Sequence, residues 1–297
     1  MSIESGFVPT DFGDFAILDF GGGGPGALLV HEVLDNAEYW RPAAEQMTDF
    51  CRPVAVDLQG HGQTAVRGLS QDDHIRALAQ VADNLGFHKP LLAGEGVGGW
   101  LLTAGTALGR FHPGALLLLE CAYAGTHAQM QDHFAQFDVP EFYDTTVARM
   151  RLGQMVTAAD REGFVAELMS ATNRDWSFDD IANDWLEPAV RRSLLRHGGQ
   201  WLRQPDRETL TNVVRSGGAS LPYPSAAVYQ DLTVPIHVIM TSEALYHDLP
   251  DEIDAMIVAA PNRRLSVVKA NFNVTMTHPQ DVIRAAQSLI AGMEQDD

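Results

Sequence analysis

One stretch, residues 91–104, constrains the fold of this sequence more than any other. An apolar run over 91–93 breaks into four glycines between positions 94 and 99, and apolar residues resume at Trp100. The pattern predicts a buried strand, a tight turn and a helix. A turn this tight needs backbone angles that glycine adopts easily, and the helix after it begins with unpaired N–H groups. We therefore expect a ligand or a reacting group at this turn.

Two motifs fit the glycines of the turn. The nucleophile elbow, G-x-S-x-G, needs small residues two positions before and after the nucleophile. Gly94 and Gly98 supply them, and Gly96 stands at the nucleophile position. The dinucleotide fingerprint, G-x-G-x-x-G, is satisfied by Gly94, Gly96 and Gly99, with Glu120 as the acid about 20 residues further on. The rest of the chain has to decide between them.

The composition of the chain limits the kinds of molecule that it is expected to bind. The chain has 297 residues, of which 45% are hydrophobic, and a formal net charge of −19. Such a charge opposes binding to nucleic acid, because clustered Lys and Arg are needed to neutralise phosphates. No window reaches the roughly 18 apolar residues of a membrane span. We expect a small-molecule substrate or ligand as partner, no nucleic acid and no membrane, and leave a homodimer open.

The cysteines and the spacing of possible metal ligands indicate which cellular compartment and which cofactors to expect. Cys51 and Cys121 lie in or beside apolar runs, which suits buried thiols in a reducing compartment. The N-terminus lacks a basic segment followed by an apolar one. No cluster of His, Asp or Glu has the spacing of metal ligands on one element. The sequence therefore predicts a cytoplasmic protein with no metal and no cofactor.

Strand-like runs and helical stretches are distributed unevenly along the chain. Between residues 123 and 230 the pattern is helical, with stretches such as 145–155, 162–169 and 189–201. We expect a core made of residues 1–122 and 231–297, and a helical lid over 123–230 that covers the strand ends. The runs predicted as strands are 15–20, 27–31, 54–57, the run that begins at 91, 114–120, 236–240 and 265–269, and a final helix is predicted over 279–291.

Three features in this order resemble the α/β-hydrolase superfamily: His31 at a strand end followed by Trp40, the glycine-rich loop 57–64, and the turn with its double glycine and Trp100. The resemblance covers about residues 10–122 closely. It implies a mostly parallel central sheet flanked by helices, with an inserted helical lid. A dinucleotide-binding domain would open with its fingerprint, whereas two or three predicted strands precede residue 94, so we favour the α/β-hydrolase fold.

The resemblance also implies a catalytic machinery from which this sequence departs. The family's nucleophile position holds Gly96, and its histidine position, counted back from Pro279, holds Phe272. The oxyanion-hole motif, often histidine-glycine in this family, is His31-Glu32 here. Acyl transfer by this family needs a nucleophile, a base and an oxyanion hole. We therefore predict a divergent member without the Ser-His-Asp triad and without a covalent serine intermediate.

The acid of the triad has two expected places. One follows the predicted strand 236–240, where Glu243 or Ala244 stands and our alignment favours Ala244. The other is the end of the strand before the lid, where Glu120 stands. A one-residue slip in the elbow would bring Glu95 to the tip, like the carboxylate nucleophile of epoxide hydrolases and haloalkane dehalogenases. That slip leaves Val97 where a small residue is required.

The departures favour an enzyme whose pocket persists with changed chemistry. Glu32, Glu95 and Glu120 follow strand ends that converge on the pocket of this fold, where crowded carboxylates raise one another's pKa. We expect these residues to act as general acids and bases on a small, aromatic or polyketide-like molecule, by elimination, cyclisation, isomerisation or epoxide opening. Relatives in natural-product pathways carry altered triads. Predicted substrate contacts are His31, Gly96, Val97, Trp100, Tyr123, His127 and Phe272.

Two other hypotheses stay open. Loss of the triad is also expected of a catalytically inactive pseudo-hydrolase that binds a small ligand or a protein partner. An NAD(P)-binding protein is the third, because of the glycine fingerprint.

Overall fold

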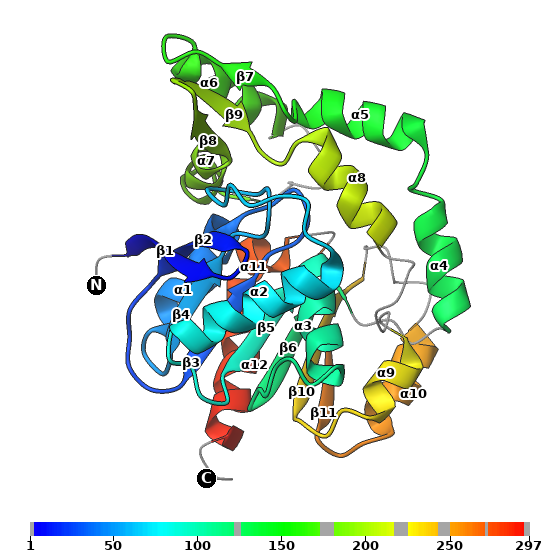
Figure 1. Cartoon of the computed structure of the whole chain (residues 1–297). Helices are drawn as coiled ribbons and strands as arrows, with labels where there is room; N and C mark the ends of the chain where they lie inside the picture. Colours follow the sequence, from blue (N-terminus) through cyan, green and yellow to red (C-terminus); the bar gives the residue numbers. More distant parts are fainter. Residues whose placement is uncertain are drawn as a thin grey trace.

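The computed structural model describes residues 3–121, 126–172, 181–216, 225–242, 250–270 and 273–293. Its centre is an eight-stranded sheet in the order β1-β2-β4-β3-β5-β6-β10-β11, in which the six strands from β4 to β11 run parallel (Figure 1). The strands are β1 (Glu4–Thr10), β2 (Gly13–Asp19), β3 (Gly26–Val30), β4 (Arg52–Val56), β5 (Leu91–Glu95), β6 (Ala115–Leu119), β10 (Ile236–Thr241) and β11 (Arg263–Val268).

Helices cover both faces of this sheet. Along β3, Leu28 and Val30 belong to the apolar cluster that also contains side chains of α2 (Gln71–Asn84), α3 (Val97–Ala107) and α10 (Pro250–Val258). Ala27 and Leu29 point the other way, against α1 (Arg41–Met47) and α12 (Pro279–Met293). A strand buried on both faces is a continuous apolar run, so the core strands could be predicted, and they are confirmed. The final helix predicted over 279–291 is confirmed as α12. The short elements are η1 (Ala37–Trp40), α9 (Ala226–Gln230) and α11 (Val274–Thr277).

Strand β1 was not among the predicted strands. It pairs antiparallel with β2 at the edge of the sheet, and Val8 is its one buried hydrophobic residue. A strand with so few buried side chains lacks the alternation of apolar and polar residues that marks a half-buried strand.

Between β6 and β10 the described chain forms an inserted, mostly helical region. Its helices are α4 (His127–Ala135), α5 (Pro140–Met150), α6 (Arg161–Thr172), α7 (Asn183–Arg192) and α8 (Arg207–Ser216). Figure 1 shows this insert, green to yellow, outside the layers of the core. Its apolar side chains pack with Tyr39 and Met276 of the core. The insert therefore lies over the loops that follow β3 and β11.

The insert also contains a small sheet that the sequence analysis did not predict. Strands β7 (Met155–Val156), β9 (Gln200–Arg203) and β8 (Leu194–His197) pair antiparallel in this order. The predicted helix over 189–201 is therefore wrong beyond Arg192. Gly198 and Gly199 both have positive φ and form the turn between β8 and β9, and a glycine pair at a two-residue turn is a hairpin signal.

Two further features of the described chain bear on the expectations. Cys51 and Cys121 are buried and free, as predicted. Among the described residues, no helix is both long and apolar enough to cross a membrane.

Candidate functional site

The turn between β5 and α3 has the geometry that the elbow motif requires. Gly96 joins the two elements with φ 49° and ψ −119°. A Cβ on Gly94 would lie 2.4 Å from Gly99 N, and one on Gly98 would lie 2.5 Å from the carbonyl oxygens of Val30 and His31. Small residues at 94 and 98 are therefore necessary, and Gly96 stands at the tip.

The slip considered for Glu95 does not occur. Glu95 is the last residue of β5, and its side chain is 2% exposed. The turn conformation falls on the next residue, Gly96.

The carboxyl group of Glu32 lies directly over Gly96. A Cβ on Gly96 would lie 1.1 Å from Glu32 Oε2. Val97 N–H donates to Oε2 over 2.7 Å, and Val33 N–H donates to Oε1 over 2.5 Å. In this fold, the oxyanion hole consists of the N–H that follows the nucleophile position and an N–H from the loop after β3. Glu32 therefore fills the oxyanion hole together with the space where a side chain of residue 96 would stand.

His31 holds the loop that carries Glu32. Its side chain is 1% exposed, Nδ1 donates to the Glu32 carbonyl oxygen over 2.7 Å, and Nε2 accepts from Leu58 N over 3.0 Å. Burial lowers the pKa of His31 to about 4, and one donor with one acceptor is the bonding pattern of a neutral imidazole. Both ring nitrogens are thus committed to the backbone.

Glu95 and Glu120 connect neighbouring elements beneath this loop. Glu95 accepts from Val274 N over 2.9 Å and from Thr275 Oγ1 over 3.1 Å, which joins β5 to α11. Glu120, 4% exposed, follows β6 with a positive φ and accepts from Thr241 N at the end of β10. Its Oε2 atom has no hydrogen-bond partner in the described part of the chain.

The structure brings Glu32, Glu95 and Glu120 into one interacting group. Removal from water raises the pKa of Glu32 to about 8, of Glu95 to about 7 and of Glu120 to about 8. Backbone hydrogen bonds oppose this rise, and the charge of Glu95 adds to it at both other residues. Glu32 is partly exposed, whereas Glu95 and Glu120 are buried.

These shifts predict how stability depends on pH. Because the three pKa values are raised from 4.5 in the folded protein, folding keeps protons that the unfolded chain has released. That contribution is lost as pH rises through the folded-state values. We expect the free energy of unfolding to fall by about 2 to 4 kcal/mol between pH ~6.5 and ~8.5, measured by urea denaturation. Glu32→Gln should flatten the slope, and a slope that rises with pH contradicts the shifts.

The other residues predicted as substrate contacts do not come together in one site of the described chain. Val97 and Trp100 line a cavity of about 20 Å³ beside α3, together with His61 and His74, a volume that holds about one water molecule. His127 is exposed at the start of α4. Tyr123 and Phe272 lie outside the described residues, as do Glu243 and Ala244. Among the residues that are described, no group of three or more side chains could hold a metal ion.

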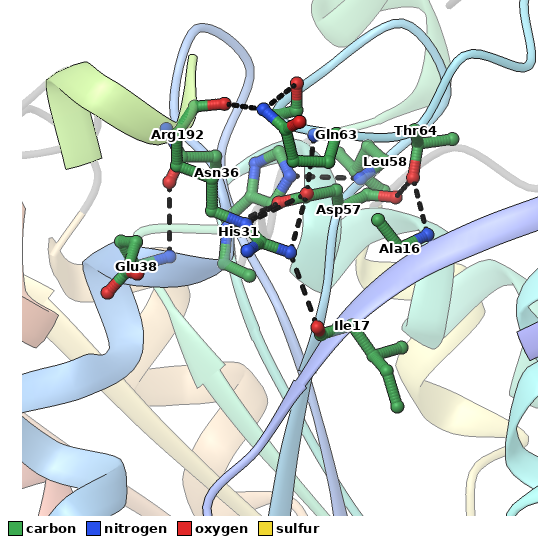
Figure 2. A network of polar contacts seen from close by, with 12 residues as sticks. Ala16, Ile17, His31, Asn36, Glu38, Asp57, Leu58, Gln63, Thr64 and Arg192 are labelled. Atoms are coloured by element: carbon green, nitrogen blue, oxygen red, sulfur yellow. Dashed lines mark hydrogen bonds and ion pairs between the residues drawn. The ribbon is translucent and has the colours of Figure 1, made fainter. Parts of the chain in front are cut away.

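Asp57 fastens the insert to the core, a role that the sequence analysis missed. It is fully buried after β4 and accepts from Ala37 N over 2.8 Å and from Gln63 N over 2.7 Å. Arg192 of α7 makes an ion pair with it at 2.9 Å, as Figure 2 shows. Asn36 adds a hydrogen bond of 2.9 Å to the Ala189 carbonyl oxygen of the same helix. The only local signal in the sequence is an aspartate after an apolar strand.

Solved structures share this fold at low sequence identity. An E-2-(acetamidomethylene)succinate hydrolase has a TM-score of 0.76 and 16% identity, with 98% of this chain and 100% of that chain covered. A thioesterase domain from a curacin biosynthetic pathway has a TM-score of 0.68 and 14% identity, covering 97% and 100%. An esterase from Thermogutta terrifontis has a TM-score of 0.63 and 17% identity, covering 98% and 99%.

Among proteins with curated descriptions, none matches the sequence. The family model described as the alpha/beta hydrolase family matches residues 21–285. That match spans most of the chain and includes the six parallel strands of the sheet, the elbow and the insert. The chain belongs to the alpha/beta hydrolase family.

Proposed function

We propose that this protein is an enzyme that moves protons at Glu32 and Glu95 on a small molecule, with no Ser-His-Asp triad and no covalent serine intermediate. The observation that carries this proposal is the position of the Glu32 carboxyl group over Gly96. In this family the reacting atoms lie at the tip of the elbow, so a side chain over Gly96 contacts any ligand that binds there. Glu32 is thereby the proposed catalytic residue.

The environments of the two carboxyl groups support different roles. With a pKa of about 8, Glu32 is mostly protonated near neutral pH and donates a proton to a leaving group or an epoxide oxygen. Glu95, with a pKa of about 7, is more often ionised and serves as the base. The charge of Glu95 raises the pKa of Glu32 and of Glu120. Such an arrangement supports elimination, cyclisation, isomerisation or epoxide opening.

The proposal predicts that Glu32→Gln lowers turnover by about 10²- to 10⁴-fold, because the amide cannot exchange a proton. Ligand affinity should change far less, since the amide keeps nearly the same shape. Consumption of compounds from a metabolite extract, followed by mass spectrometry, measures turnover of a substrate whose identity is still open. A product that has lost one water or kept its mass indicates elimination or isomerisation, whereas a gain of one water indicates hydrolysis or epoxide hydration.

The matched control is Glu45→Gln, which removes an exposed carboxylate from α1. It should leave turnover unchanged. Equal turnover in Glu32→Gln and the wild type contradicts the proposal, as does labelling of the wild type by a fluorophosphonate, which reacts with activated serines.

A pseudo-hydrolase is the second candidate, and one specific observation favours it. The carboxyl groups of Glu32, Glu95 and Glu120 all accept hydrogen bonds from backbone N–H groups, as structural carboxylates do. A binding protein would consume no metabolite, and Glu32→Gln would change affinity alone. The NAD(P) hypothesis has less support, because the side chain of Glu120 bonds Thr241 N instead of facing a ribose site.

A further inference from the structure

Arg203, at the end of β9, has donors that no described protein group accepts. Its side chain is 6% exposed, and Nη1 donates to the Gln204 carbonyl oxygen over 2.6 Å. Nε is buried and has no hydrogen-bond partner in the part of the chain that the structure describes. A buried guanidinium with unused donors is costly, because it has given up water without a replacement.

The other buried arginines of the described chain are better satisfied. Arg192 is paired with the carboxylate of Asp57. Arg263 donates through both terminal nitrogens to backbone carbonyl oxygens, although its Nε is also without a partner among the described residues. Arg203 makes a single hydrogen bond of this kind and no ion pair with any described carboxylate. Its Nε and Nη2 form one edge of the planar fork, and no described residue bonds to that edge.

The Arg203 guanidinium interacts electrostatically with buried groups that accept no hydrogen bond from it. Asp35 and Tyr39, both 6% exposed, are hydrogen-bonded to each other, and the Arg203 charge acts on both. Burial and the charges of Glu95 and Glu32 raise the pKa of Asp35 well above its usual range. Asp35 lies within electrostatic reach of both Arg203 and Glu32. Neither Asp35 nor Tyr39 accepts a hydrogen bond from the guanidinium, whose Nε has no partner in the described chain.

We propose that the free edge of Arg203 binds a carboxylate of the substrate, so that the substrates of this protein are small organic acids whose reacting part lies at Glu32. Nε–H and Nη2–H match the two oxygens of a carboxylate side by side, which a lysine ammonium does not. Arg203 belongs to the insert and Glu32 to the core, so such a ligand bridges the two. The inference deepens the proposed function, because it names the substrate class of the same site.

The test measures binding and does not require turnover. Acetate, succinate and benzoate are titrated into the wild type, with their methyl esters as uncharged counterparts. The readouts are the melting temperature and the NMR signal of the Arg203 Nε–H. We expect at least one acid to raise the melting temperature and shift that signal, and its ester to do neither. If no acid shifts the Nε–H signal, the proposal is overturned.

Variants of Arg203 separate a ligand-binding role from a structural one. Arg203→Met should abolish carboxylate binding, and Arg203→Lys should weaken it about tenfold or more, because the bidentate contact is lost. Without ligand, Arg203→Met should melt at the same or a higher temperature, because a buried guanidinium with an unbonded donor is removed. A large fall in melting temperature would mean that Arg203 is structural. Arg196→Met, at an exposed position of β8, is the matched control and should bind as the wild type does.

Glu32→Gln distinguishes this inference from the proposed function. The variant should still bind the carboxylate, since Arg203 is intact, while its turnover is lost. Carboxylate binding without any effect of Glu32→Gln on turnover would refute the proposed chemistry and keep the Arg203 site. Loss of turnover in Glu32→Gln, together with no carboxylate binding by the wild type, would refute the Arg203 site and keep the proposed chemistry.

Discussion

Replacing Gly96 with serine is expected to lower the free energy of unfolding by about 3 to 5 kcal/mol. A side-chain carbon at this position would lie 1.1 Å from Glu32 Oε2, so the carboxyl group would have to leave. Its departure breaks the hydrogen bonds from Val33 N–H and Val97 N–H. The positive φ of residue 96 adds backbone strain for any residue with a Cβ. Urea denaturation at one pH measures the loss.

Two controls identify the source of this loss. Gly86 also has a positive φ, but a Cβ there would meet nothing within 4 Å, so Gly86→Ser should cost only the strain, about 1 kcal/mol. Adding Glu32→Gly to Gly96→Ser removes the clash and should restore about half of the lost stability, since contacting residues couple strongly. If Gly96→Ser costs no more than Gly86→Ser, the carboxyl group does not fill this space.

Replacing Asp57 with alanine should cost about 3 to 5 kcal/mol, because it leaves the guanidinium of Arg192 buried without a counter-ion. Asp57 is fully buried and Arg192 is 8% exposed, so water cannot replace the lost carboxylate. The N–H groups of Ala37 and Gln63 lose their acceptor in the same step. Urea denaturation again gives the free energy of unfolding.

The ion pair between Arg284 and Asp281, at 2.6 Å, provides the comparison. Its side chains are 66% and 31% exposed, and Asp281→Ala should cost less than about 1 kcal/mol, as for surface pairs in general. Adding Arg192→Met to Asp57→Ala should recover part of the loss, since no charge then stays buried. Equal effects of the two alanine substitutions would contradict the buried character of the pair.

The core of the fold could be predicted because it depends on local patterns. The inner parallel strands β4, β3, β5, β6 and β10 are buried on both faces, so each is an apolar run that ends at a polar residue or at the elbow. The antiparallel parts were harder. β1 buries little, and β8 is a short strand whose first residue, Leu194, directly continues the helical pattern of α7. In the second case the glycine pair at 198–199 was the signal that the helical periodicity obscured.

The candidate site also has one part that could be predicted from the sequence and another that could not. The elbow could be located from glycine spacing alone, because the close contact between Gly94 and Gly99 joins residues a few positions apart. The direction of the Glu32 side chain could not be predicted, because its hydrogen-bond partner Val97 is 65 residues away in the sequence. Arg192 and Asp57 are separated by 135 residues. No pattern in one segment indicates such a pair, and the raised pKa of Asp35 depends on burial that only the packed structure defines.

The attachment of the insert limits how this protein can be re-engineered. Excising the insert would strand the carboxylate of Asp57 in the core without its cation, and would remove the Gln204 amide that donates to the Gly62 carbonyl oxygen over 2.9 Å. The insert is therefore no interchangeable module. A chimaera that exchanges it with the lid of a relative must keep an arginine and an amide at these two places, or redesign the loop that follows β4.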